Sequence, residues 1–65
     1  MNQKEFGRAY YTMLSAMKDS VAMELGLELT RAGISKDVAQ RMIATAQSSI
    51  DRIGGNAFDS LNKSL

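Results

Sequence analysis

The chain has 65 residues, of which 45% are apolar and 23% are charged, values typical of globular rather than disordered proteins. It contains no cysteine and no histidine, which excludes disulfides, zinc sites built on these ligands, and catalytic triads that use histidine. Eight basic and seven acidic residues give a net charge of +1, so the overall charge indicates no particular partner. A chain of this length forms at most one small domain, residues 1–65.

The first predicted element is a long helix over residues 3–32. Its apolar residues recur every three or four positions and so share one face: Phe6, Tyr10, Met13, Leu14, Met17, Val21, Leu25 and Leu29. Gly33 is expected to adopt the left-handed conformation that ends helices, and Ile34 to fold back onto the last turn.

A second helix is predicted over residues 36–53, with Ser35 as its N-cap and Asp37 in its first turn. Its apolar stripe consists of Val38, Ala39, Met42, Ile43, Ala46, Ile50 and Ile53. Gly54 and Gly55 are expected to end this helix. A short third helix is predicted over residues 57–64, capped by Asn56.

The short connection around Gly33 makes the first two helices antiparallel neighbours, so the predicted fold is an all-α helical hairpin. With these lengths, the second helix ends level with Leu14 and leaves the first dozen residues uncovered. We therefore expect the short third helix and a second copy of the chain to cover them, giving a homodimer or an assembly of dimers. A compact monomeric three-helix bundle is the alternative. The expected oligomer or partner interface comprises Phe6, Tyr10, Met13, Leu14, Met17, Phe58 and Leu61.

One exposed face of the first helix is a candidate site for an anionic ligand such as a nucleotide. It carries Lys4, Arg8, Tyr11 and Lys18 at helical spacing. Arginine and lysine bind phosphate and tyrosine can stack on a base, so the face can hold a phosphate-bearing ligand. An ordinary solvated helix face explains the same residues.

Two further patterns have simpler explanations. Glu24 and Glu28 lie one turn apart and can hold a cation, but Arg31 stands ready as a counter-ion, and we expect no metal and no cofactor. Residues 29–43 invite comparison with a DNA-binding helix-turn-helix, yet the turn is shorter than in that motif and the second helix carries acidic as well as basic residues.

The leading functional prediction is a small non-enzymatic helical oligomer that acts by stoichiometric binding to a larger protein, which it inhibits or regulates. The alternatives are capture of a small anion such as a nucleotide between protomers, and nucleic-acid binding by repeated basic faces. The longest apolar stretch is too short to span a membrane and residues 1–7 do not resemble a secretory signal, so a cytoplasmic location is expected. No segment identifies a family.

Overall fold

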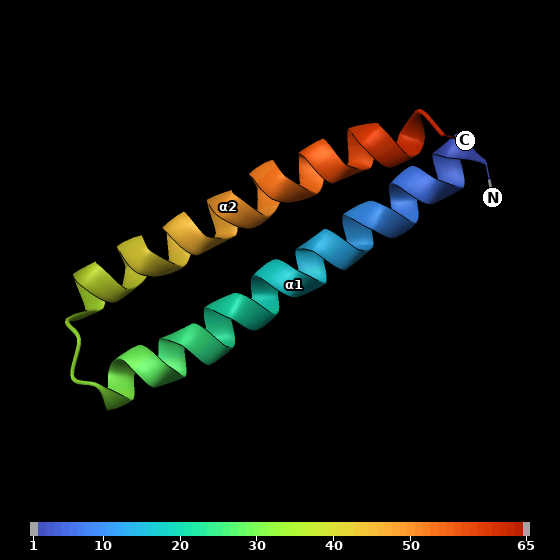
Figure 1. Cartoon of the computed structure of the whole chain (residues 1–65). Coiled ribbons are helices and arrows are strands. Elements are labelled where there is room, and N and C mark those ends of the chain that lie inside the picture. Colours follow the sequence, from blue (N-terminus) through green and yellow to red (C-terminus); the bar gives the residue numbers. More distant parts are fainter. Residues whose placement is uncertain (1, 65) are drawn as a thin grey trace.

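The computed structural model describes residues 2–64 and contains two helices, α1 (Gln3–Arg31) and α2 (Lys36–Asn62). They lie side by side and antiparallel, so that the start of α1 and the end of α2 meet at one end of a rod (Figure 1). The rod measures 46 × 15 × 13 Å. The predicted all-α helical hairpin is confirmed.

The connection between the helices has the left-handed glycine that the sequence predicts. Gly33 has a φ of 76°, in the left-handed region that favours glycine. Its amide donates to the carbonyl of Thr30 at 3.1 Å, and the amide of Ile34 donates to the carbonyl of Leu29 at 3.0 Å. These two bonds satisfy carbonyls that the end of α1 would otherwise leave unpaired.

The expected end of the second helix at residue 53 and the separate helix over residues 57–64 are wrong. Helix α2 runs without interruption through Gly54 and Gly55 to Asn62. The physical reason is tertiary: Gly54 is buried where α2 packs on Leu14 of α1. This close packing offsets the helix propensity of about 1 kcal/mol that a glycine loses relative to alanine.

The expectation that the first dozen residues are left uncovered is wrong for the described residues, because α1 has 29 residues and α2, with 27, runs alongside it. Phe58 lies against Phe6 with ring centroids 5.3 Å apart and planes nearly parallel, and it meets Tyr10 edge to face at the same distance. This aromatic cluster closes the terminal end of the hairpin. The length mismatch therefore gives no reason for oligomerisation.

Polar contacts fix how far along the rod each helix lies relative to the other. The ammonium of Lys18 lies 3.0 Å from a carboxylate oxygen of Asp51, and the side-chain amide of Gln47 donates to the Lys18 carbonyl at 3.1 Å. At the terminal end, the side-chain amide of Gln3 donates to the carbonyl of Asn62 at 3.4 Å. The two helices are therefore in register along their whole length.

Two helices alone do not enclose a large core, because side chains at the edges of their interface remain open to solvent. Among residues 2–64, Leu29 is the only buried apolar side chain, at 8% exposure. The large apolar side chains that remain exposed are Tyr11, Met13, Met17, Met23, Leu27, Ile34, Val38, Met42, Ile53 and Leu61. Much of the apolar surface of residues 2–64 therefore remains exposed to solvent.

Candidate interaction surfaces

The hairpin has two broad sides, one on each side of the interface between α1 and α2. On the first, a groove of about 290 Å³ follows that interface over the terminal half. It is lined by Tyr10, Met13, Leu14, Met17, Ile50, Ile53, Gly54 and Ala57. Toward the connection, a hollow of about 470 Å³ is lined by Val38, Arg41, Met42, Thr45 and Ala46.

These two depressions belong to one side of the molecule. Val38, Met42 and Ala46 precede Ile53 by 15, 11 and 7 residues, and these spacings place them on the same face of a helix. We call this side the apolar flank and define it by the exposed or half-buried Met13, Met17, Val38, Met42, Ala46 and Ile53.

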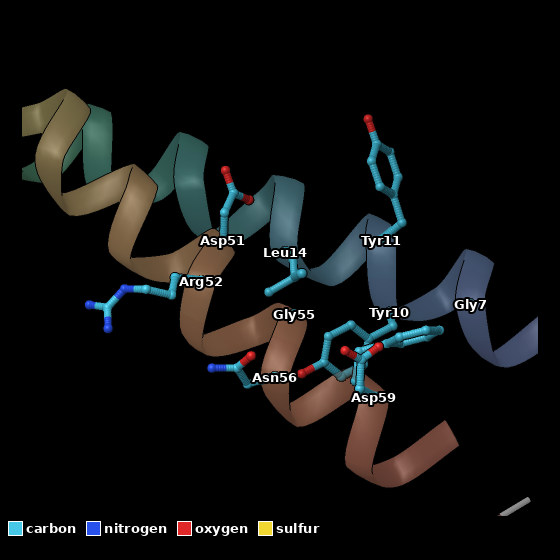
Figure 2. Close-up of a pocket in the computed structure, with 10 residues that line it drawn as sticks. Gly7, Tyr10, Tyr11, Leu14, Asp51, Arg52, Gly55, Asn56 and Asp59 are labelled. Carbon is cyan, nitrogen blue, oxygen red and sulfur yellow. The ribbon is translucent and has the colours of Figure 1, made fainter. Parts of the chain in front are cut away.

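The opposite side carries a hollow of about 540 Å³, which we call the Tyr11 hollow. It is lined by Gly7, Tyr10, Tyr11, Leu14, Asp51, Arg52, Gly55, Asn56, Phe58 and Asp59. Figure 2 shows Tyr11 projecting away from the ribbon, whereas Tyr10 reaches across toward α2. Apolar rings and Leu14 line the hollow together with polar side chains from α2. No side chain lies within 4 Å of where a Cβ of Gly55 would be, so the hollow is open at that point.

The residues predicted to form an oligomer or partner interface divide into two groups. Phe6, Tyr10, Leu14 and Phe58 are half-buried and lie between the helices of one chain. Met13 and Met17 are each 46% exposed on the apolar flank, and Leu61 is also exposed. Only the second group is free to contact another molecule over much of its surface, and such a contact stays a prediction.

The predicted anion-binding face is brought together only in part. Tyr11, which is 73% exposed, lines the hollow, but Lys4 and Arg8 do not. Lys18 is paired with Asp51, and its ammonium contacts both carboxylate oxygens, at 3.0 and 3.3 Å. Asp51 and Asp59 line the hollow beside Tyr11, and their negative charge opposes a phosphate there.

Sequence reasoning missed the part of this hollow that lies beyond residue 53, because it ended the second helix there. Asp51, Gly55 and Asp59 are spaced by four and therefore share one face of a continuous helix. That spacing could have indicated a shared surface, but only if α2 was known to continue through Gly54 and Gly55.

Glu28 is engaged within its own helix, where its carboxylate accepts from the guanidinium of Arg31 at 2.8 Å. Within residues 2–64, no three acidic side chains come together in a way that could hold a metal ion. Over the same residues, neither helix is apolar enough along a sufficient length to cross a membrane.

The geometry of residues 29–43 also differs from that of a helix-turn-helix. In that motif the two helices meet at a steep angle, whereas α1 and α2 lie side by side and antiparallel (Figure 1). Neither end of α2 is set apart from α1 as a separate reading helix would be.

Comparisons with protein-family models, with curated protein sequences and with solved structures gave no match. The class that the geometry defines is a two-helix hairpin with an apolar flank on one side and the Tyr11 hollow on the other. Function is inferred from these two surfaces.

Proposed function

We propose that this protein acts without catalysis, by stoichiometric binding of the Tyr11 hollow to a larger protein that it inhibits or regulates. The observation that carries the proposal is the 73% exposure of Tyr11 beside a hollow lined by the rings of Tyr10 and Phe58. Exposed tyrosine and arginine side chains next to an apolar depression are typical of the residues that dominate protein–protein binding. Arg52 also lines this hollow.

The polar lining supports a particular chemistry for the partner. Asp59 and Asn56 present oxygen acceptors at the hollow, and Asp51 does so while paired with Lys18. A protein segment that inserts an apolar side chain beside Tyr11 and carries a lysine or arginine next to it matches this surface. An apolar centre with a polar surround is the usual arrangement of such interfaces.

Anion capture by Lys4, Arg8, Tyr11 and Lys18 is less well supported. Asp51 already neutralises Lys18, and two carboxylates line the hollow that Tyr11 borders. Two carboxylates and one guanidinium, that of Arg52, line the hollow, so a phosphate there would meet more acidic than basic groups. The charge arrangement therefore favours a basic protein segment over a nucleotide.

Affinity capture with matched variants tests this function. The wild-type chain and Thr12→Ala are expected to recover the same protein in a fixed molar ratio, and Tyr11→Ala and Asp59→Lys are expected to lose it. Thr12 is the matched control because it is exposed, neighbours Tyr11 and bonds only to the Arg8 carbonyl of its own helix. Native mass spectrometry of the purified chain runs in parallel. A retained nucleotide that Arg8→Glu releases, with no protein lost in Tyr11→Ala, would overturn the proposal.

A further inference from the structure

We infer that the apolar flank is the docking surface for a second copy of this chain, and that two hairpins pack face to face with their connections at the same end. The inference goes beyond the proposed function because it concerns the opposite side of the hairpin from the Tyr11 hollow. It rests on three observations: the apolar side chains left exposed there, the size of the flank, and the position of its charges.

The exposed side chains extend over about half of the rod, since the helical rise from Val38 to Ile53 is about 22 Å of its 46 Å length. Ile53 is 62% exposed, and Met13, Met17, Val38 and Met42 are each more than one third exposed. Because they share one side of the hairpin, they form a continuous apolar surface rather than scattered single residues. A continuous surface of this kind is stabilised by covering it with another apolar surface.

The size of this side of the hairpin fits a second copy. The whole side of a rod that is 46 Å long and 15 Å wide offers about 700 Å² of contact per chain, close to the roughly 800 Å² per partner of a stable interface, and the apolar flank makes up about half of it. A two-fold symmetric dimer buries the same flank on both copies, so no apolar half is left uncovered. The product is a four-helix bundle, in which the side chains of four helices enclose the core that two helices leave open.

The charges on the flank select the orientation. Glu24 and Glu28 follow Met17 by seven and eleven residues and therefore lie on the same side of α1, nearer the connection. Gly26 lies level with Ile43, since a Cβ on Gly26 would be 3.8 Å from Cδ1 of that isoleucine. Arg41, beside Met42 in the hollow on this side, is therefore close to the level of the two glutamates.

A two-fold axis parallel to the rod sets α1 of one copy on α2 of the other at the same levels. Glu24 and Glu28 then face Arg41 of the second copy. In the same arrangement Met13 and Met17 bracket Ile53 of the second copy, because Leu14 is level with Gly54. Opposite charges meet near the connection and apolar side chains meet near the chain ends.

The other face-to-face arrangement has its two-fold axis across the rod and lays α1 on α1 in opposite directions. With the rods fully overlapped, Glu24 and Glu28 of each copy then face the region of Tyr10 and Phe6 of the other. Carboxylates set against aromatic side chains are costly unless they find partners; Glu28 has Arg31 of its own helix, whereas Glu24 has no ion pair within residues 2–64. The charge pattern therefore favours the arrangement with both connections at one end.

Sedimentation equilibrium and native mass spectrometry of the full chain test the inference. We expect a dimer for the wild type and for Tyr11→Ala, whose change lies on the other side. Ile53→Asp should abolish the dimer. Arg41→Glu should raise the dissociation constant of the dimer about tenfold, because the new carboxylate repels both glutamates. Combining Arg41→Glu with Glu24→Arg and Glu28→Arg should restore the wild-type constant, which distinguishes lost charge pairing from lost folding.

The orientation is tested separately, because the chain has no cysteine of its own. With a spin label on Ser35→Cys in each copy, the distance between the two labels should be less than half of the 46 Å length of the rod. A separation near the full rod length overturns the orientation. A helical wild-type monomer at all concentrations, or an oligomer that Ile53→Asp and Arg41→Glu leave unchanged, overturns the docking surface. Neither result bears on capture by the Tyr11 hollow, so the two proposals fail independently.

Discussion

Gly54 of α2 and Leu14 of α1 are so close that a Cβ atom on Gly54 would lie 2.6 Å from Cδ2 of Leu14 and 3.0 Å from its Cδ1. The Cγ of Leu14 would be only 3.4 Å away, so the whole end of the leucine side chain occupies the space above the glycine. Gly55, the next residue, has no such neighbour within 4 Å. Two adjacent glycines in one helix therefore have opposite roles in packing.

Gly54→Ala is expected to lower the free energy of unfolding by about 1 kcal/mol. The added methyl group gains about 1 kcal/mol of helix propensity but overpacks Leu14, at a cost of roughly 1–3 kcal/mol. Gly55→Ala gains the propensity with no clash and should raise the free energy of unfolding by about 0.5–1 kcal/mol. Urea unfolding followed by circular dichroism, with all variants at one protein concentration, measures both values. Equal shifts of the two variants in the same direction would contradict the close approach.

The contrast between these glycines also shows what the sequence could not predict. Periodicity predicts both helices and Gly33 predicts the turn, since each depends on residues within a few positions. Whether Gly54 ends a helix or lets two helices approach depends on Leu14, forty positions away in the chain. Local signals favoured a helix end, and the tertiary contact decided otherwise.

The predicted helix end at residue 53 also affected the prediction of the candidate sites. Lys18 and Tyr11 could be placed on one face of α1 from spacing alone. Their neighbours Asp51 and Asp59 belong to α2, and the continuation of α2 past residue 53 brings Asp59 to the hollow. The sequence therefore predicted the cations of this side but not the carboxylates that alter its charge.

Phe58→Ala is expected to lower the free energy of unfolding by about 2 kcal/mol, less than the 3–5 kcal/mol of a fully buried phenylalanine because the ring is half-buried. The change removes the stack on Phe6 and the edge contact with Tyr10, both with centroids 5.3 Å apart. Phe58→Leu keeps most of the apolar volume and should lose about half as much. Amide hydrogen exchange should accelerate mainly at residues 3–10 and 55–62. Uniform acceleration along both helices would show that the cluster does not act locally.

Asp51→Asn is expected to lower the free energy of unfolding by no more than about 0.5 kcal/mol, although it breaks the contact with Lys18 at 3.0 Å. Asp51 is 57% exposed, so water and salt screen this pair. Gln47→Ala removes the partly buried hydrogen bond to the Lys18 carbonyl and should cost about 1 kcal/mol. Thermal unfolding at low and high salt separates the two. The difference in melting temperature between the wild type and Asp51→Asn should shrink as salt rises, whereas the difference for Gln47→Ala should not. A salt-sensitive difference for Gln47→Ala would contradict its assignment to an uncharged hydrogen bond.

The two helix starts should respond differently to alanine. Asn2 caps α1 with a side-chain oxygen that accepts from the amide of Glu5 at 2.8 Å, and sequence reasoning did not single it out. Ser35 holds the N-cap position of α2, as predicted, but its hydroxyl makes no capping bond. We therefore expect Asn2→Ala to lower the free energy of unfolding by about 0.5–1 kcal/mol and Ser35→Ala to change it by less than about 0.3 kcal/mol, since the capping bond is the main benefit of these residues.

Chemical denaturation of the two single variants and the double variant measures both effects. The effects should add, because the two caps lie at opposite ends of the rod. A larger loss for Ser35→Ala would mean that the serine hydroxyl does bond to the first turn of α2.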